Sequence, residues 1–233
     1  MQGYFVSGTD TGVGKTWITL GLMGALKNRF FTVAGMKPVA SGCELTSAGL
    51  RNEDARLIQV QCSAMPRYEQ VNPYAFEPGI APHVAAAMAG IHIDLERIAD
   101  CYRELARSVN TVVVEGVGGW RVPLNETQTL RDLVALLQLP VILVVGIRLG
   151  CINHALLTAE TIRRDGLKLA AWVANQVEAD YSMPGATLDY LRRHIEAPLM
   201  GVVPCMTVLQ PERIAACLRI EVLHGESLQN RGK

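Results

Sequence analysis

A glycine-rich segment near the N-terminus places the strongest constraint on how this chain can fold. Gly8-Thr9-Asp10-Thr11-Gly12-Val13-Gly14-Lys15-Thr16 lies between an apolar run, Tyr4–Val6, and a stretch, Lys15–Asn28, whose apolar residues recur at helical spacing. Glycines in such a turn let successive backbone N–H groups face one anion, and the N-terminus of the following helix adds partial positive charge. The sequence therefore predicts a phosphate-binding loop, in which Lys15 reaches the β- and γ-phosphates and the Thr16 hydroxyl binds Mg²⁺.

The loop departs from the usual pattern at one position. That pattern has a glycine five residues before Gly14, where this chain has Thr9, and the nearest glycine is Gly8. The alternative is a flexible turn that contains Gly-Lys-Thr by chance. The strand before the segment and the helix after it favour the phosphate loop.

Short apolar runs alternate with helical patterns along the rest of the chain. Runs that are apolar on both faces and separated by helices predict an α/β fold, with a mostly parallel sheet covered by helices on both faces. We expect a single domain over residues 1–224 and a polar, disordered tail over 225–233. Strands are expected at Tyr4–Val6, Thr32–Lys37, Thr111–Val114, Val141–Val145, Leu169–Ala174 and Leu199–Val203. Helices are expected at Lys15–Asn28, His83–Met88, Asp94–Arg107, Leu130–Leu137, Asn153–Arg164 and Thr187–His194. A further helix is expected to begin after Asn52, which would be its N-cap, and Asn72–Pro82 is expected to be irregular.

Composition excludes several classes of partner. The 22 Lys+Arg balance 22 Asp+Glu, so no net charge favours nucleic acid or an anionic membrane. No apolar run approaches the ~18 residues of a membrane-spanning helix, and the first residues do not resemble a secretory signal. The six cysteines include no Cys-x-x-Cys pair, which favours reduced, mostly buried thiols in a cytoplasmic protein.

An acidic residue follows the expected strand Thr111–Val114. Glu115 is succeeded by Gly116-Val117-Gly118-Gly119, and open α/β sheets bind ligands at the carboxyl ends of their strands. Glu115 could therefore complete a magnesium site beside Thr16. The alternative is an acid that only marks the end of a strand, and the nearby phosphate loop favours the metal role.

Several motifs in this order and spacing together resemble the dethiobiotin synthetases, over about Tyr4 to Glu212. Besides the phosphate loop, they are Lys37-Pro38-Val39-Ala40-Ser41-Gly42, Glu115-Gly116-Val117-Gly118-Gly119 and Trp172-Val173-Ala174-Asn175. The resemblance implies an ATP- and Mg²⁺-dependent ligase of biotin synthesis. It would join CO₂ to 7,8-diaminopelargonate and release dethiobiotin, ADP and phosphate, through a carbamate and a carbamic–phosphoric anhydride.

The resemblance also assigns roles to individual residues. Lys15 and Lys37 would be catalytic, supplying with Mg²⁺ the positive charge that two anionic reactants need. The magnesium ligands would be Thr16, Asp54 and Glu115. The nucleotide would be bound by Gly12, Val13, Gly14, Lys15, Thr16, Trp17, Asp54, Glu115, Gly116, Val117, Gly118, Asn175, Gln176, Pro204, Cys205 and Met206. The substrate would be bound by Thr11, Ser41, Gly150, Cys151 and Asn153.

Plainer interpretations stand beside some of these roles. Asp54 could be an ordinary acid in a helix's first turn, Lys37 a solvated strand-end lysine, Ser41 a turn residue and Asn175 a turn-forming asparagine. The resemblance favours adenine recognition by Asn175, whose amide both donates and accepts. Glu212 is a further candidate for a nucleotide contact.

The family's helix N-terminus at Gly150-Cys151-Ile152-Asn153 comes from a second subunit and holds the substrate's carboxylate, which implies a homodimer. The main alternative is a partner-switched ATPase of the ParA and MinD type. Those proteins carry an extra lysine where this chain has Asp10. Gly12, Val117 and Gln176 differ from residues common in the dethiobiotin synthetases.

Overall fold

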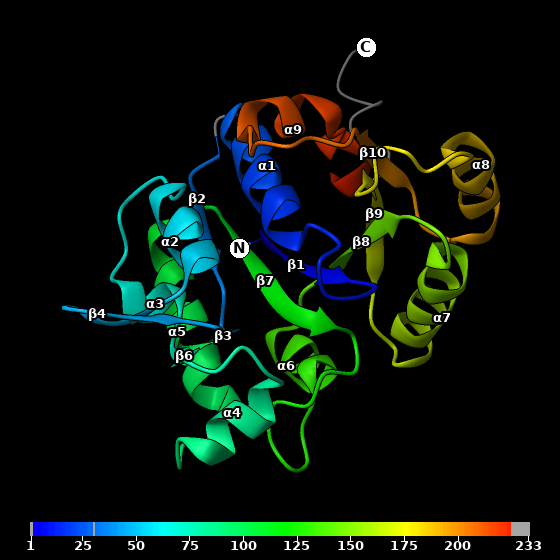
Figure 1. Ribbon diagram of the computed structural model, residues 1–233. Helices are drawn as coiled ribbons and strands as arrows, with labels where there is room; N and C mark the ends of the chain where they lie inside the picture. The colour runs from blue at the N-terminus through cyan, green and yellow to red at the C-terminus, as the bar shows by residue number, and fades with distance from the viewer. Residues whose placement is uncertain (1, 30, 225–233) are drawn as a thin grey trace.

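The computed structural model describes residues 2–29 and 31–224. Its centre is a six-stranded sheet with the order β10-β9-β8-β1-β7-β2, and every neighbouring pair of strands is parallel (Figure 1). The expected α/β class with a mostly parallel sheet is therefore confirmed. The strands are β1 (Gln2–Gly8), β2 (Val33–Met36), β7 (Thr111–Gly119), β8 (Val141–Ile147), β9 (Leu169–Gln176) and β10 (Leu199–Val203).

Helices cover both faces of this sheet and enclose two hydrophobic clusters. Side chains of β1 alternate between the clusters, since Phe5 belongs to one and Tyr4 and Val6 to the other. On the Phe5 side lie α4 (Pro82–Met88), α5 (Leu95–Ser108), α6 (Leu130–Leu137), α7 (Cys151–Arg164) and α8 (Pro184–His194). On the opposite side lie α1 (Lys15–Lys27), α2 (Glu53–Val60), α3 (Tyr68–Val71), α9 (Pro211–Cys217) and the 3₁₀ turn η1 (Ile220–His224).

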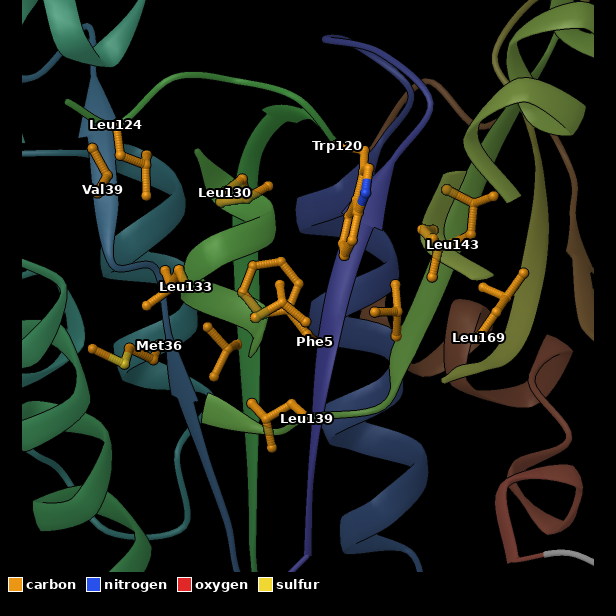
Figure 2. Packing of buried hydrophobic residues seen from close by; sticks show 14 of the residues in the cluster. Phe5, Met36, Val39, Trp120, Leu124, Leu130, Leu133, Leu139, Leu143 and Leu169 are labelled. Atoms are coloured by element: carbon orange, nitrogen blue, oxygen red, sulfur yellow. The ribbon is translucent and has the colours of Figure 1, made fainter. Parts of the chain in front are cut away.

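The Phe5 side of the sheet is tightly packed beneath the site described below. Figure 2 shows Phe5 with Leu130 and Leu133 of α6, and all three are buried. A Cβ atom on Gly116 of β7 would come within 2.9 Å of both Phe5 and Leu130. Glycine at this position lets the ring and the helix close directly over β7.

Two small sheets extend the β2 side of the molecule. β3 (Val39–Ser41) pairs in parallel with β6 (Tyr74–Phe76), and β4 (Glu44–Thr46) forms a hairpin with β5 (Gly49–Arg51). The expectation that Asn72–Pro82 is irregular is therefore wrong for β6. Because β6 has only three residues and pairs with a strand more than thirty positions earlier, it has no local periodic signal.

Most expected element boundaries lie within a few residues of those observed. α6 and β10 have the expected bounds, and Asn52 is the N-cap of α2, its side chain accepting from the Ala55 N–H at 3.2 Å. β7 is longer than expected, so Glu115 lies inside the strand. Within the described residues no helix is long and apolar enough to cross a membrane. The expected tail, 225–233, lies outside the described residues.

Two glycines on α1 give a matched test of how this helix packs on α9. A Cβ on Gly21 would overlap the side chain of Ile214, whereas one on Gly24 would lie 3.5 Å from the Ala215 Cβ, an ordinary contact. We expect Gly24→Ala to stabilise the protein by ~0.5–1 kcal/mol because alanine favours helix. Gly21→Ala should destabilise it by about 1–3 kcal/mol through overpacking. Urea unfolding measures both, and equal effects would contradict this packing.

Candidate active site

A cavity of about 850 Å³ opens at the carboxyl ends of the strands, where β1 leads into α1. It collects parts of the chain that are far apart in sequence. The predicted site residues that line it are Thr11, Gly12, Gly14, Lys15, Thr16, Trp17, Lys37, Ser41, Asp54, Glu115, Gly116, Val117, Gly118, Asn175, Gln176, Pro204, Cys205 and Met206. The cavity therefore brings together the expected catalytic, metal-binding and nucleotide-binding residues, with the exception of Val13.

The glycine-rich segment forms the start of α1. Gly14 is the helix N-cap with φ 86°, and no side chain caps the helix. A Cβ on Gly14 would also overlap the side-chain amide nitrogen of Asn175. Backbone conformation and close approach therefore both require glycine here. Gly14, Lys15 and Thr16 line the cavity, so the uncapped start of α1 can bind an anion there.

Asn175 supports this loop from β9. Its Nδ2 donates to the Val13 carbonyl at 2.9 Å, and the side chain is buried. Val13 itself points into the core, so its predicted nucleotide contact would have to come from its backbone. The sequence suggested a base-reading role for Asn175, and its contact with the loop was not predicted.

Lys15 is the first residue of α1, and its side chain is buried against the preceding loop. Its Nζ donates to the Asp10 carbonyl at 3.0 Å. Desolvation by burial is the main cause that lowers the pKa of Lys15 to about 8, with the nearby Lys37 charge adding to it and Glu115 opposing it. Near neutral pH the side chain is therefore largely charged, while above pH 8 it is largely neutral.

Glu115 is the centre of the charged cluster in this cavity. It is 1% exposed, and its Oε1 accepts from Lys37 Nζ at 2.6 Å and from Thr16 Oγ1 at 2.8 Å. Lys37 Nζ also donates to Asp54 Oδ2 at 2.7 Å. Burial alone would lower the pKa of Lys37, but attraction to Glu115 and Asp54 outweighs it and raises that pKa above the usual value. Lys37 is thus a charged, paired residue and not a solvated strand end.

The residues around Glu115 fit a magnesium ion. Glu115 Oε2 is buried without a hydrogen-bond partner in the described part of the chain, so the carboxylate has an oxygen ready for a cation. Thr16 and Asp54 supply further oxygens beside it. The described residues contain no group of three or more His, Cys, Asp or Glu that could hold a metal. Two carboxylates and a hydroxyl suit magnesium, which commonly completes its shell with phosphate and water oxygens.

The structure ties Asp10 to a residue that sequence reasoning missed. Arg148, which follows β8, donates to Asp10 Oδ2 at 2.8 Å, and Asp10 Oδ1 accepts the Thr11 N–H at 2.7 Å. Arg148 comes directly after the buried strand β8, and a charged residue at the carboxyl end of a strand is the sequence feature that could have identified it. The residues that line the cavity and were not among the predicted site residues are Asn52, Gly79, Ile80, Ala81, Pro82, Val122, Pro123 and Val177.

Four expected contact residues lie apart from the cavity. Gly150, in the left-handed region at φ 88°, is the N-cap of α7, which begins at Cys151, two residues earlier than expected. Asn153 is in the first turn of that helix, and Glu212 is exposed on α9. Of the six free cysteines Cys43 and Cys151 are buried and the other four are half-buried, so the expectation of mostly buried thiols is confirmed only in part.

A parallel sheet whose first strand leads through this loop into α1 defines a P-loop NTPase. Solved structures agree on the fold: a MinC:MinD cell division complex from Aquifex aeolicus aligns at TM-score 0.56 and 13% identity, covering 94% of this chain and 88% of that one. A ParA family ATPase from Chlorobium tepidum TLS aligns at TM-score 0.56 and 13% identity, covering 96% and 93%. A family model described as an AAA domain matches residues 2–213.

Sequence relatives define the family more narrowly. The chain is 51% identical over 224 residues to the ATP-dependent dethiobiotin synthetase BioD of Pseudomonas paraeruginosa, covering 96% of this chain and 98% of the relative. It is 47% identical over 222 residues to the protein of that name in Cellvibrio japonicus, covering 95% and 97%. The chain belongs to the ATP-dependent dethiobiotin synthetase family, and the resemblance seen in its motifs is confirmed.

The ion pair of Lys37 with Glu115 gives a stability prediction. Lys37→Met leaves the Glu115 charge buried without its cation, which should destabilise the protein by about 3–5 kcal/mol at neutral pH. The double variant Lys37→Met/Glu115→Gln removes both charges and should recover most of that loss. Urea unfolding of the two variants makes the comparison, and a double variant no more stable than Lys37→Met would contradict the pairing.

Proposed function

We propose that this chain carries out the dethiobiotin synthetase reaction in the cavity at the end of β1 and β7. The observation that carries the proposal is the placement of Lys37 and Lys15 in one cavity with the start of α1. An amine of 7,8-diaminopelargonate attacks CO₂ and loses a proton, which gives a carbamate. A carbamate oxygen then attacks the γ-phosphorus of ATP and ADP leaves. The second amine attacks the carbonyl carbon of the anhydride and loses a proton, and phosphate leaves as the ring closes.

We assign the nucleotide to the loop at the start of α1. The uncapped N–H groups and Lys15 would bind its phosphates, and the base would lie toward Asn175, Gln176 and Pro204–Met206. A magnesium ion held by Thr16, Asp54 and Glu115 would neutralise charge on the phosphate oxygens. Trp17 lines the same part of the cavity and offers an apolar surface to the nucleoside.

Lys37 is the residue that we assign to the carbamate and the transferred phosphoryl group. An ammonium has three N–H donors, and Asp54 and Glu115 accept two of them, so one remains for a reacting oxygen. The pair of carboxylates holds the side chain in place before substrate arrives. Such preorganised charge stabilises a transition state without reorganisation at the moment of reaction.

The carbon chain of the diamine is proposed to extend from Thr11 and Ser41 toward a second subunit. Gly150, Cys151 and Asn153 lie apart from the cavity of one chain, which is consistent with their reaching the substrate from the partner of a homodimer. The start of α7 has no side-chain cap, so the N–H groups of its first turn suit a carboxylate, although the Cys151 N–H donates to the Arg148 carbonyl at 3.1 Å. We further propose that the enzyme works in the cytoplasm and binds neither nucleic acid nor membrane.

A partner-switched ATPase is disfavoured by the residue at position 10. Asp10 occupies the place of the extra lysine of the ParA and MinD proteins, and Arg148 and the Thr11 N–H bind both of its carboxylate oxygens. This side chain is therefore committed to the loop of its own chain.

The reaction is tested by its product. With ATP, magnesium, bicarbonate and 7,8-diaminopelargonate, the purified protein should form dethiobiotin, detected by mass spectrometry. It should release phosphate only when the diamine and bicarbonate are both present. Lys37→Ala should lower turnover by about 10²–10³-fold, the scale of losing one charge-stabilising group, while calorimetry still detects ATP binding. ATPase activity that depends on DNA or a protein partner and not on the diamine would overturn the proposal.

The lowered pKa of Lys15 predicts proton uptake when nucleotide binds. Lys15 is charged below pH 8 and increasingly neutral above it, and a bound triphosphate favours the charged form. Binding at pH 8.5 should therefore take up roughly 0.5–0.8 proton, and the affinity for ATP should fall as pH rises further. Calorimetry in two buffers of different ionisation enthalpy measures the uptake. Lys15→Arg, whose side chain stays charged, is the control and should show no such proton uptake on binding ATP. Equal uptake in both proteins would mean that a group other than Lys15 takes up the proton.

A further inference from the structure

A network of buried polar contacts lies behind the candidate site and joins the backbone at Lys37 to the start of α2. Its members are Asn72, Tyr68 and Asn52, which are 3%, 7% and 8% exposed. Of the three, only Asn52 lines the cavity. Buried polar groups are costly unless they are paired, so a fully paired set fixes the geometry of the segments that it joins.

One end of this network holds the backbone of Lys37. The Lys37 N–H donates to the Val71 carbonyl at 2.8 Å, and Asn72 Nδ2 donates to the Lys37 carbonyl at 2.7 Å. β2 ends at Met36, and beyond this strand the Lys37 N–H and carbonyl are both hydrogen-bonded to the segment 71–72. The segment 71–72 therefore sets where the Lys37 side chain begins.

The other end holds the start of α2, which carries Asp54 in its first turn. The Asn52 N–H donates to the Tyr68 hydroxyl at 2.8 Å, and the Asn52 side chain caps the helix through the Ala55 N–H. Asp54 is only two residues further on. The position of its carboxylate therefore follows from the position of Asn52.

The Tyr68 hydroxyl connects the two ends. It accepts from the Asn52 N–H and donates to Asn72 Oδ1 at 3.0 Å, so one oxygen serves both. The Arg51 guanidinium lies 4.1 Å from the centre of the Tyr68 ring and packs it from outside. This hydroxyl therefore bridges the backbone that carries Lys37 and the helix that carries Asp54.

We propose that Tyr68 and Asn72 are positioning residues that fix the Lys37 ammonium against the Asp54 carboxylate, and with it the geometry of the metal-binding oxygens. The inference rests on the proposed reaction for its kinetic test and on the proposed nucleotide and metal sites for its Mn²⁺ test. Neither residue touches the cavity, and both act through the backbone of residues that do. Loss of the hydroxyl would let α2 and the Lys37 segment move apart and separate Lys37 Nζ from Asp54 Oδ2, which are 2.7 Å apart.

The chain offers a closely matched control in Tyr74. Its hydroxyl also accepts a backbone N–H from a helix N-cap, that of Asp94 before α5, at 2.9 Å, and the residue is 4% exposed. Among the described residues that hydroxyl bonds only Asp94, and the contacts of Tyr74 with Pro38 and Asn72 are made by its backbone, which the substitution leaves in place. Tyr68→Phe and Tyr74→Phe therefore both delete a hydroxyl that accepts the N–H of a helix N-cap. Only Tyr68→Phe deletes one that also joins the Lys37 segment to α2.

The experiment compares these two variants with the parent enzyme by thermal melting, steady-state kinetics and metal binding. We expect both variants to melt at lowered but similar temperatures. Tyr68→Phe should reduce kcat for dethiobiotin formation about tenfold, with less than a threefold change in KM for ATP, whereas Tyr74→Phe should keep the parent kcat. Electron paramagnetic resonance should show Mn²⁺ bound about tenfold more weakly by the ADP complex of Tyr68→Phe alone. Asn72→Ala should resemble Tyr68→Phe, and the double variant should lose little more than either.

The outcomes separate this inference from the proposed function. Equal kcat and equal Mn²⁺ affinity in the two tyrosine variants would overturn the positioning role, and so would additive losses in the double variant. If Tyr68→Phe does not fold, Asn72→Ala decides alone, by its Mn²⁺ affinity against that of Tyr74→Phe. If the parent enzyme forms no dethiobiotin, the proposed reaction fails, and Mn²⁺ affinity still tests the inference.

Discussion

The structure of the site depends on the pairing of one carboxylate that is buried inside a hydrophobic sheet. Glu115 sits within β7, where its neighbours Val112, Val113 and Val114 are fully apolar and buried. An isolated charge there would be strongly destabilising, so the fold has to bring partners to it. Lys37 comes from the end of β2 and Thr16 from α1, while Asp54 on α2 shares Lys37. The requirement to satisfy one carboxylate therefore draws three separate elements to a single point, which is also the end of the phosphate loop.

The parallel sheet supplies the place where this can happen. β1 and β7 are paired so that Glu115 lies opposite Val6, and the pairing slips before Gly8, where the chain leaves β1 for the loop. The buried carboxylate and the uncapped start of α1 are therefore neighbours because of strand register. Asn175 at the end of β9 supports the loop from the other side, against a glycine that leaves room for it. Loop, carboxylate and amide each belong to a different strand of one sheet.

What the sequence predicted well is local, and what it missed depends on contacts between distant segments. Lys15 and Thr16 are recognisable because a strand, a turn and a helix follow each other within a few residues. Glu115 is recognisable because it directly follows an apolar run and precedes a glycine-rich segment, and Asn52 was placed correctly as a cap from its immediate neighbours. β6 and the β4–β5 hairpin consist of three-residue strands, too short for a periodic pattern. Arg148 pairs with a residue 138 positions away, and Tyr68 and Asn72 act on Lys37 more than thirty positions earlier. Only two of the six thiols are fully buried, because cysteine content alone does not say where on its helix or loop a residue lies.

The charge balance of the cavity explains why the lysines alone cannot perform the proposed reaction. Among the described residues that line it, the charged side chains are Lys15, Lys37, Asp54 and Glu115, two of each sign. Arg148 adds nothing to this balance, because Asp10 neutralises it. A nucleotide triphosphate and a carbamate are both anions, so a site with no net charge does not attract them together. In the proposed reaction the missing positive charge would come from the N-terminus of α1 and from a divalent cation, and the carboxylates that cancel the lysines are the groups that can bind that cation. Neutrality without nucleotide and the proposed dependence on magnesium are thus two consequences of the same four side chains.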